Sequence, residues 1–142
     1  MAAAAKAERI AAAEVRVETG FLDDAEHVVV AFGTPAKFVR YVVRRLRDEG
    51  VRIGYVRPIT LWPFPYEAVA AATERARTVM VLEVNAGQMI DDVRLGVLGR
   101  APVVPVGGIS TDHSGFGVGA LLDAEVIRGR IEAALSGSEV PA

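Results

Sequence analysis

The feature of this chain that most constrains its fold is a pair of short apolar runs. Residues 27–32 read HVVVAF and residues 78–84 read TVMVLEV, a run that is interrupted only by Glu83. A strand that is apolar on both faces has to be covered on both faces, as in a parallel sheet flanked by helices. Longer helical patterns alternate with these runs, so the sequence predicts an α/β fold with a largely parallel sheet, in which residues 27–32 form a central strand.

The helix expected over residues 34–49 has the clearest signals. Thr34 and Pro35 are expected to be its N-cap and its first residue. Phe38, Val42 and Leu46 recur four residues apart and are expected to form its apolar face. Its outer surface is expected to be basic through Lys37, Arg40, Arg44, Arg45 and Arg47.

The remaining elements continue the alternation. An edge strand with one solvent-exposed face is expected over residues 14–18, a further strand over 51–57 and a last edge strand over 103–106. The other helices are expected over 66–76, 87–98 and 123–135. Three prolines make residues 58–65 an ordered or interface-bound loop.

Length and composition indicate one domain. A chain of 142 residues with 51% hydrophobic residues fits a single core. We expect a flexible or helical N-terminal arm over residues 1–12, an α/β domain over 13–135 and a disordered tail over 136–142. A formal charge of -2, with acids and bases mixed along the chain, predicts a protein that binds neither nucleic acid nor membranes.

Two absences in the sequence limit location and chemistry. The alanine-rich N-terminus lacks the leucine-rich core of a signal peptide, and no long apolar stretch is present, so a cytoplasmic protein is expected. The chain has no cysteine, which excludes disulfides, zinc thiolates and iron–sulfur ligation by this chain.

In open α/β sheets, ligands and partners bind at the carboxyl ends of the strands. Residues 33–35, 57–65 and 83–87 are expected at that edge. Thr34 and Asn85 each open a predicted helix, whose free N–H groups are able to hold an anion. Plain helix capping is the favoured role for both residues.

Glu83 is the most informative single residue, because a carboxylate at the end of an apolar strand should be paired or lie at the sheet edge. Arg57 ends another strand and is the expected partner, across about 10 Å if the strand of Gly33 lies between them. A structural ion pair is favoured over a general base.

Trp62 and Phe64 place two large aromatic side chains in the stiff loop WPFP. Exposed aromatic residues on loops commonly anchor interfaces. The alternative is that they fold back over the core of the domain itself, and an interface is favoured for Trp62. A cis peptide bond before Pro63 or Pro65 is compatible with this loop.

Glycines in residues 107–119 suggest a phosphate loop, but that motif should follow the first strand, so a surface loop is favoured. Asp112, His113 and Ser114 are adjacent in sequence, whereas a catalytic triad is defined by spatial geometry. His27 and His113 lie far apart and make a poor metal site. No catalytic, cofactor-binding or metal-binding residue is therefore assigned.

The segments VVVAFGTPAKFVRYVVRRLRDEGVRIGYVRPITLWPFP and VLEVNAGQMIDDVRLGV resemble the second domain of the α chains of 2-oxoacid:ferredoxin oxidoreductases. The resemblance runs from Asp24 to Val97 and is expected to fade beyond it. Its specific marks are RPITLWPFP and EVNAGQM. It implies a three-layer α/β/α domain like the C-terminal domain of transketolase, with a five-stranded sheet in the order 1-3-2-4-5 and an antiparallel first strand.

By the same resemblance, the family oxidatively decarboxylates a 2-oxoacid with coenzyme A to an acyl-CoA and passes electrons through iron–sulfur clusters to ferredoxin. Thiamine diphosphate and Mg²⁺ belong to an N-terminal α domain and a β chain, whose motifs this sequence lacks. The residues that carry over are expected to face neighbouring domains. They are Arg57, Pro58, Trp62, Pro63, Phe64, Glu83, Asn85, Gly87, Gln88 and Met89, and Thr34 joins them at the same edge.

The sequence thus predicts a non-catalytic assembly domain of a thiamine-dependent 2-oxoacid:acceptor oxidoreductase, present as a split subunit, an excised domain or a stand-alone relic. Its expected partners are the thiamine-binding α N-terminal domain and the β subunit, with ferredoxin an indirect partner. The alternative is a small-molecule or anion-binding module using Thr34 and Asn85, and a hydrolase through Ser114 and His113 comes third. An isolated chain is expected to self-associate as a homo-oligomer through Trp62 and Phe64.

Overall fold

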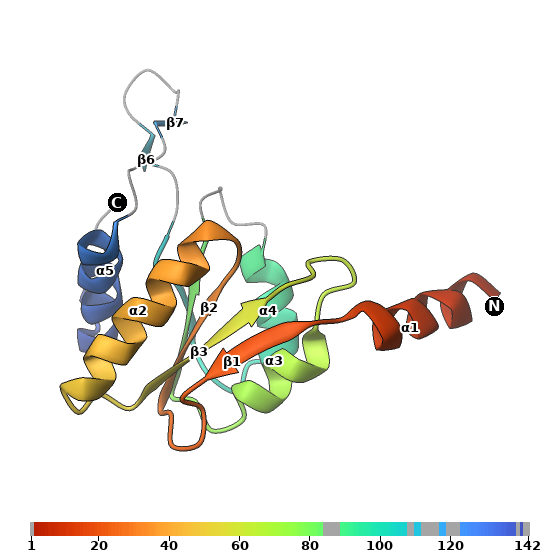
Figure 1. The fold of residues 1–142 in the computed structure, drawn as a ribbon, viewed down its shortest axis with the longest axis horizontal. Coiled ribbons are helices and arrows are strands. Elements are labelled where there is room, and N and C mark those ends of the chain that lie inside the picture. The colour runs from red at the N-terminus through yellow and green to blue at the C-terminus, as the bar shows by residue number, and fades with distance from the viewer. Residues whose placement is uncertain are drawn as a thin grey trace.

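The computed structural model describes residues 2–83, 89–107, 110–111, 117–118, 123–138 and 140. Its helices are α1 (Ala2–Glu14), α2 (Thr34–Asp48), α3 (Tyr66–Ala72), α4 (Met89–Val97) and α5 (Ala124–Ser136). Its strands are β1 (Val17–Gly20), β2 (His27–Ala31), β3 (Ile53–Pro58), β4 (Thr78–Leu82), β5 (Val103–Pro105), β6 (Ser110–Thr111) and β7 (Gly117–Val118). Figure 1 shows their arrangement.

The main sheet has five strands in the order β1-β3-β2-β4-β5. β1 runs antiparallel to β3, and the other neighbouring pairs are parallel. The predicted fold class, strand order and antiparallel first strand are therefore confirmed. β2 is the central strand and β5 lies at an edge, as their sequence patterns predicted.

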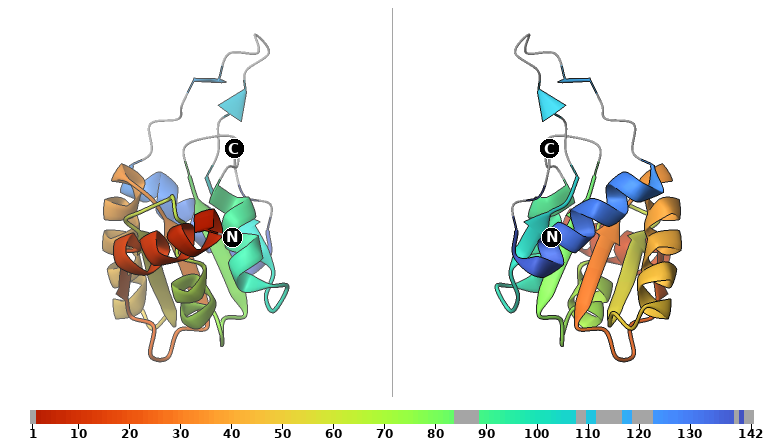
Figure 2. Two further views of the ribbon diagram at one scale, coloured as in Figure 1. Left: turned by 90° about the vertical axis from the view of Figure 1, so that its right-hand side faces the viewer. Right: turned by 90° about the vertical axis from the view of Figure 1, so that its left-hand side faces the viewer.

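Helices cover both faces of this sheet, as Figure 2 shows. One core cluster joins Val29 and Ala31 of β2 to buried residues of α2 and α5. The other joins Val28 and Val30 of the same strand to buried residues of α3 and α4. Because successive side chains of a strand point to opposite faces, the continuous apolar run of β2 supplies both clusters.

α2 corrects two details of the sequence prediction. Phe38 is exposed, whereas Val39, Val42 and Leu46 are buried. Residues four apart drift by about 40° around a helix with 3.6 residues per turn, so Phe38 falls outside the buried stripe. The N-cap is Gly33, with φ 73°, and Thr34 is already the first helical residue. Glycine adopts this positive φ without strain, and Thr34 provides no side-chain cap.

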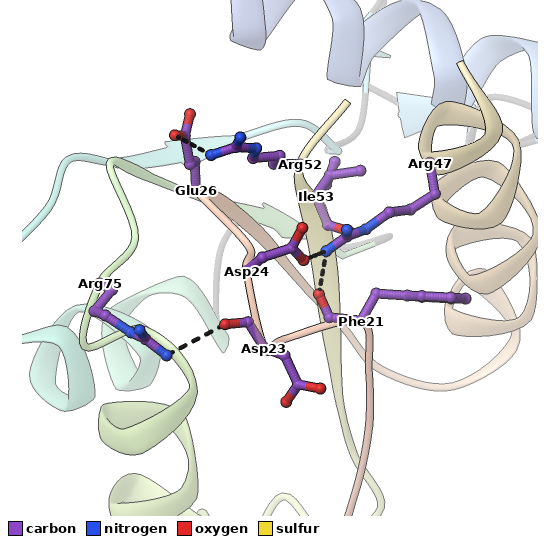
Figure 3. A network of polar contacts seen from close by, with 8 residues as sticks. All are labelled: Phe21, Asp23, Asp24, Glu26, Arg47, Arg52, Ile53 and Arg75. Atoms are coloured by element: carbon purple, nitrogen blue, oxygen red, sulfur yellow. Dashed lines mark hydrogen bonds and ion pairs between the residues drawn. The ribbon is translucent and has the colours of Figure 1, made fainter. Parts of the chain in front are cut away.

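Arg47 also departs from the basic outer surface expected for α2, because only 18% of its side chain is exposed. Its Nε donates to the Ile53 carbonyl at 2.8 Å and its Nη2 to the Phe21 carbonyl at 2.6 Å. Nη2 also pairs with Asp24 at 2.5 Å, and this hydrogen bond lowers the pKa of the Asp24 carboxyl. Figure 3 shows that Arg47 ties the end of α2 to the segment before β2 and to the start of β3.

Two segments project from the body of the domain in Figure 1. The N-terminal arm forms the helix α1, one of the two states expected for it. The glycine-rich region contains β6 and β7, which pair antiparallel, while Asp112, His113 and Ser114 lie outside the described residues. None of the described helices combines the length and the hydrophobicity that a membrane-spanning segment requires.

Candidate docking surface at the carboxyl edge

The carboxyl edge is where β3, β2 and β4 end and the segments containing residues 59–65, Gly33 and Glu83 begin. The parallel register places Val30 beside Val56 and Ala31 beside Leu82, so these three strand ends are level. The three predicted peptides therefore start from one edge of the sheet. Asn85, Gly87 and Gln88 lie outside the described residues.

Glu83 is a helix cap. Its residue is only 8% exposed, and its carboxylate accepts hydrogen bonds from the backbone N–H of Met89 at 2.7 Å and of Ile90 at 3.0 Å. A carboxylate is favoured at a helix N-terminus because it satisfies free N–H groups and meets the positive end of the helix dipole. The anion position at the start of α4 is thus filled by the chain's own Glu83, which counts against an anion-binding module there.

The predicted ion pair between Glu83 and Arg57 is wrong. β2 does lie between their strands, as expected. However, Arg57 pairs with Glu18 of β1, with Nη1 and Oε2 3.3 Å apart. The two acceptors lie on opposite faces, since Glu83 bonds to α4 while Glu18 also bonds to Arg40 of α2.

Adjacency in the sheet explains why Arg57 pairs with Glu18. Glu18 is directly opposite Arg57 in the antiparallel β1–β3 pair. Side chains in such cross-strand pairs lie about 5 Å apart at Cβ, half the distance across two strands. Tyr55 adds its hydroxyl to the same carboxylate at 3.0 Å, and burial together with this hydrogen bond raises the pKa of Tyr55. Glu18 and Tyr55 were not among the predicted site residues, because only the register of the β1–β3 pair places them beside Arg57.

The loop at residues 59–65 separates its two aromatic side chains. Trp62 is 81% exposed and precedes a cis peptide bond to Pro63. Phe64 is 6% exposed, belongs to the core cluster under α3 and α4, and contacts the Tyr66 ring at a centroid distance of 5.0 Å. Phe64 therefore follows the alternative prediction and covers the core of the domain, while Trp62 projects into solvent.

Two further apolar side chains of this loop are exposed, Ile59 at 50% and Leu61 at 39%. We call Ile59, Leu61 and Trp62 the apolar loop. Its base is fixed, because the Ile59 N–H donates to the Arg16 carbonyl at 2.9 Å and the Arg16 N–H donates to Thr60 Oγ1 at 3.2 Å. Of these three residues only Trp62 was predicted as an interface residue, although the sequence ITLW places Ile59 and Leu61 close to it.

Among the described residues predicted at this edge, Thr34 and Met89 contribute little exposed apolar surface. Thr34 is exposed and polar, and Met89 is buried in the core cluster that contains residues of α3 and α4. In residues 2–83, 89–107 and the described parts of the C-terminal region, no group of three or more His, Cys, Asp or Glu side chains is arranged to hold a metal ion. The exposed side chains of Ile59, Leu61 and Trp62 make this edge a candidate surface for contact with another protein.

His27 lies at the start of β2, away from the carboxyl edge, between Ile53 and Thr78 in the register. Its Nδ1 is buried and has no hydrogen-bond partner in the described structure. Desolvation lowers the pKa of His27, with a further decrease from Arg77 and an opposing effect of Glu26. It is a residue at the strand boundary, as its sequence position suggested.

Comparison with known proteins identifies the family of this domain. Residues 25–114 match the family described as pyruvate:ferredoxin oxidoreductase core domain II. The chain belongs to this family. The match extends beyond Val97, so the expected loss of resemblance after that residue is wrong, and part of the glycine-rich region belongs to the family domain.

This chain matches parts of larger proteins. The chain is 40% identical over 89 residues to 2-oxoglutarate synthase subunit KorA of Methanothermobacter marburgensis, which covers 63% of this chain and 24% of that protein. It is 32% identical over 122 residues to pyruvate synthase subunit PorA of Methanosarcina barkeri, with coverages of 82% and 30%. The chain thus spans about a quarter of the length of the relatives it matches.

Solved structures share the fold of this core domain II. A 2-oxoglutarate:ferredoxin oxidoreductase from Magnetococcus marinus, with 2-oxoglutarate, coenzyme A and succinyl-CoA bound, matches with a TM-score of 0.67 at 24% identity. The match covers 82% of this chain and 19% of that one. A split-gene transketolase matches with a TM-score of 0.68 at 21% identity, over 87% of this chain and 42% of the other.

Proposed function

We propose that this core domain II is a non-catalytic assembly domain of a cytoplasmic, thiamine-dependent 2-oxoacid:acceptor oxidoreductase. The observation that carries the proposal is the apolar loop at the carboxyl edge, with Trp62 81% exposed on a base held by hydrogen bonds to Arg16. A rigid loop that presents a large aromatic side chain loses little conformational entropy on docking. Such residues are frequent centres of protein interfaces.

The direct partners in this proposal are a thiamine-binding α N-terminal domain and a β subunit, and ferredoxin accepts electrons from the assembled complex. Relatives of this chain are named as subunits of 2-oxoglutarate synthase, ketoisovalerate oxidoreductase and pyruvate synthase, which supports a multi-subunit assembly. The apolar loop would pack against those subunits and help to shape the entrance to their active site.

The chemistry in this proposal resides in other polypeptides. With no cysteine in 142 residues, this chain offers no thiolate to an iron–sulfur cluster. Thiamine diphosphate and Mg²⁺ would likewise be bound by the partners, and coenzyme A would enter the complex as the acyl acceptor. In the complex, a 2-oxoacid would be decarboxylated oxidatively to an acyl-CoA. The side chains of this domain would position the partner subunits.

The proposal is tested by affinity capture of the full chain, carrying a small tag, from native lysate of the source cells. We expect a co-purifying polypeptide that binds thiamine diphosphate, identified by mass spectrometry and by its release of the cofactor on denaturation. Trp62→Ala should reduce its recovery strongly.

Leu98→Ala is a matched control, because Leu98 is 75% exposed but follows α4, which leads away from the carboxyl edge. It should leave recovery unchanged. Recovery of the tagged chain with only copies of itself, or equal effects of the two substitutions, would contradict the assembly role.

A further inference from the structure

A groove lies between the edge strand β1 and the outer side of α2, with a volume of about 610 Å³. Its cationic lining residues are Lys37, Arg40 and Arg44 from α2 and Arg57 from β3. Glu18 is the one acidic residue in its lining. We call this the cationic groove. Four cations against one carboxylate leave an excess of three positive charges, in a chain whose formal net charge is -2.

The Tyr55 ring lines the groove and packs directly against Gly20 of β1. A Cβ placed on Gly20 would clash with Tyr55 Cε1 and lie within 2.8 Å of Cζ. Any other residue at this position of β1 would therefore meet the ring. The ring is held in place, because its hydroxyl donates to Glu18 at 3.0 Å.

The two walls run side by side. Glu18 pairs with Arg40 at one end, and the Phe21 carbonyl accepts from Arg47 at the other. The three residue steps from Glu18 to Phe21 span about 10 Å in a strand, and the seven steps from Arg40 to Arg47 span about 10.5 Å in a helix. The two sides of the groove therefore have nearly equal lengths between these contacts. The cationic groove is therefore elongated along β1.

The charges in the groove are spread along it. Arg40 and Arg57, the two guanidinium groups that converge, already share the Glu18 carboxylate at 3.4 and 3.3 Å. Lys37 and Arg44 remain, seven residues apart on α2 and hence separated by about 10 Å along its axis. A compact anion such as a phosphate would be met best by convergent guanidinium groups. Separated charges suit an extended chain of acidic side chains.

Besides separated charges, binding of an extended chain requires free backbone groups, and the open edge of β1 provides them. β1 is the terminal strand of the described sheet, so its outer backbone groups have no strand partner there. An added strand would lie along Glu18, Thr19 and Gly20, which themselves line the groove. Every second side chain of the added strand would face α2, with a repeat of about 6.8 Å. At this spacing two or three carboxylates would lie opposite Lys37, Arg40 and Arg44.

We propose that the cationic groove binds an extended acidic segment of a partner polypeptide, which adds as a strand to the free edge of β1. Backbone hydrogen bonds to β1 would provide the alignment, and the cations of α2 would select Asp or Glu at alternate positions. The lining of the cationic groove includes none of Ile59, Leu61 and Trp62, so the proposal holds whether or not the apolar loop docks on thiamine-binding subunits.

The probe for a direct test is a fluorescein-labelled peptide of alternating Thr and Glu, about ten residues long, with an alternating Thr and Lys peptide for comparison. Fluorescence anisotropy with the full chain should show binding of the Glu peptide alone. Lys37→Glu with Arg44→Glu should weaken it by about tenfold or more, because both substitutions turn attraction into repulsion. Raising NaCl from about 50 to about 300 mM should also weaken binding, since both side chains are exposed to solvent.

Arg94→Glu is the matched control, since it makes the same change of charge per residue on α4, on the opposite face of the sheet. It should change the dissociation constant by less than about twofold. Amide hydrogen exchange in β1 should slow when the Glu peptide binds, which a purely electrostatic surface contact would not produce.

Three results would overturn the proposal. They are no binding of the Glu peptide to the unmodified chain, binding without protection of the β1 amides, and tighter binding of tripolyphosphate or ATP that depends on the same two cations. The last result would make the cationic groove a site for small polyanions.

Discussion

Glu83→Ala is expected to destabilise the domain by about 3 kcal/mol. Glu83 is nearly fully buried, and each of its carboxylate oxygens accepts one backbone N–H at the start of α4. A hydrogen bond to a charged group contributes about 1.5–3 kcal/mol, and its loss leaves a buried donor without a partner. Two such bonds set an upper limit near 6 kcal/mol, and water entering the vacated space offsets about half of it.

The assay is urea and thermal unfolding of the full chain followed by far-ultraviolet circular dichroism. At this chain length 1 kcal/mol corresponds to a change in Tm of about 3–4 °C, so Glu83→Ala should unfold about 10 °C earlier. Glu83→Gln retains one acceptor oxygen but no charge. Its Tm should therefore lie between those of the unmodified chain and Glu83→Ala.

Arg57→Ala separates the helix-cap role of Glu83 from an ion pair with Arg57. Arg57 and Glu18 are each about one-third exposed and 3.3 Å apart, so this variant should lose only about 1 kcal/mol. The double variant Glu83→Ala with Arg57→Ala should be additive to within about 0.5 kcal/mol, because the two residues share no partner. A loss below about 0.5 kcal/mol for Glu83→Ala, or strong coupling between the two sites, would refute the capping role.

Three further outcomes are expected. In sedimentation velocity, the unmodified isolated chain should self-associate and Trp62→Ala should not; a monomer in both cases would contradict the exposed interface. Gly20→Val should cost about 1–3 kcal/mol in urea unfolding because it displaces the Tyr55 ring, and an unchanged midpoint would show that the ring is not fixed. Because the folded-state pKa of His27 is lowered, its neutral form stabilises the fold above the unfolded-state pKa near 6.5, and this contribution is lost as the pH falls below it. Unfolding free energies at pH 7.5 and 5.5 should therefore differ less for His27→Asn than for the unmodified chain, and equal differences would exclude this linkage.

The carboxyl edge shows where prediction from sequence succeeds and where it fails. The exposed position of Trp62 and the location of three peptides at strand ends follow from short-range patterns, apolar runs followed by proline or glycine. The predicted partner of Glu83 is wrong because opposite charges at one sheet edge do not necessarily lie on the same face. The side chains of Glu83 and Arg57 point to opposite faces of the sheet. Beyond the end of a strand, the sequence pattern does not indicate to which face a side chain points.

The burial of Phe64 and the exposure of Phe38 were likewise not predictable from local sequence spacing. Phe64 lies two residues after Trp62 but is buried with the core under α3 and α4. Phe38 matched a four-residue spacing and is nevertheless exposed, because the buried stripe of α2 runs through Val39 and Val42. Burial depends on the surface that a helix or loop meets, and this surface is built from residues distant in the chain.

The sequence by itself determined the α/β class and the central place of β2, since a run that is apolar on both faces is stable only between two layers of helices. Its motifs also indicated the family. Only the tertiary structure decided that Glu83 caps α4, that Glu18 joins Arg40, Arg57 and Tyr55, and that a cationic groove follows β1. These features depend on strand order and facing, which bring together residues up to 39 positions apart.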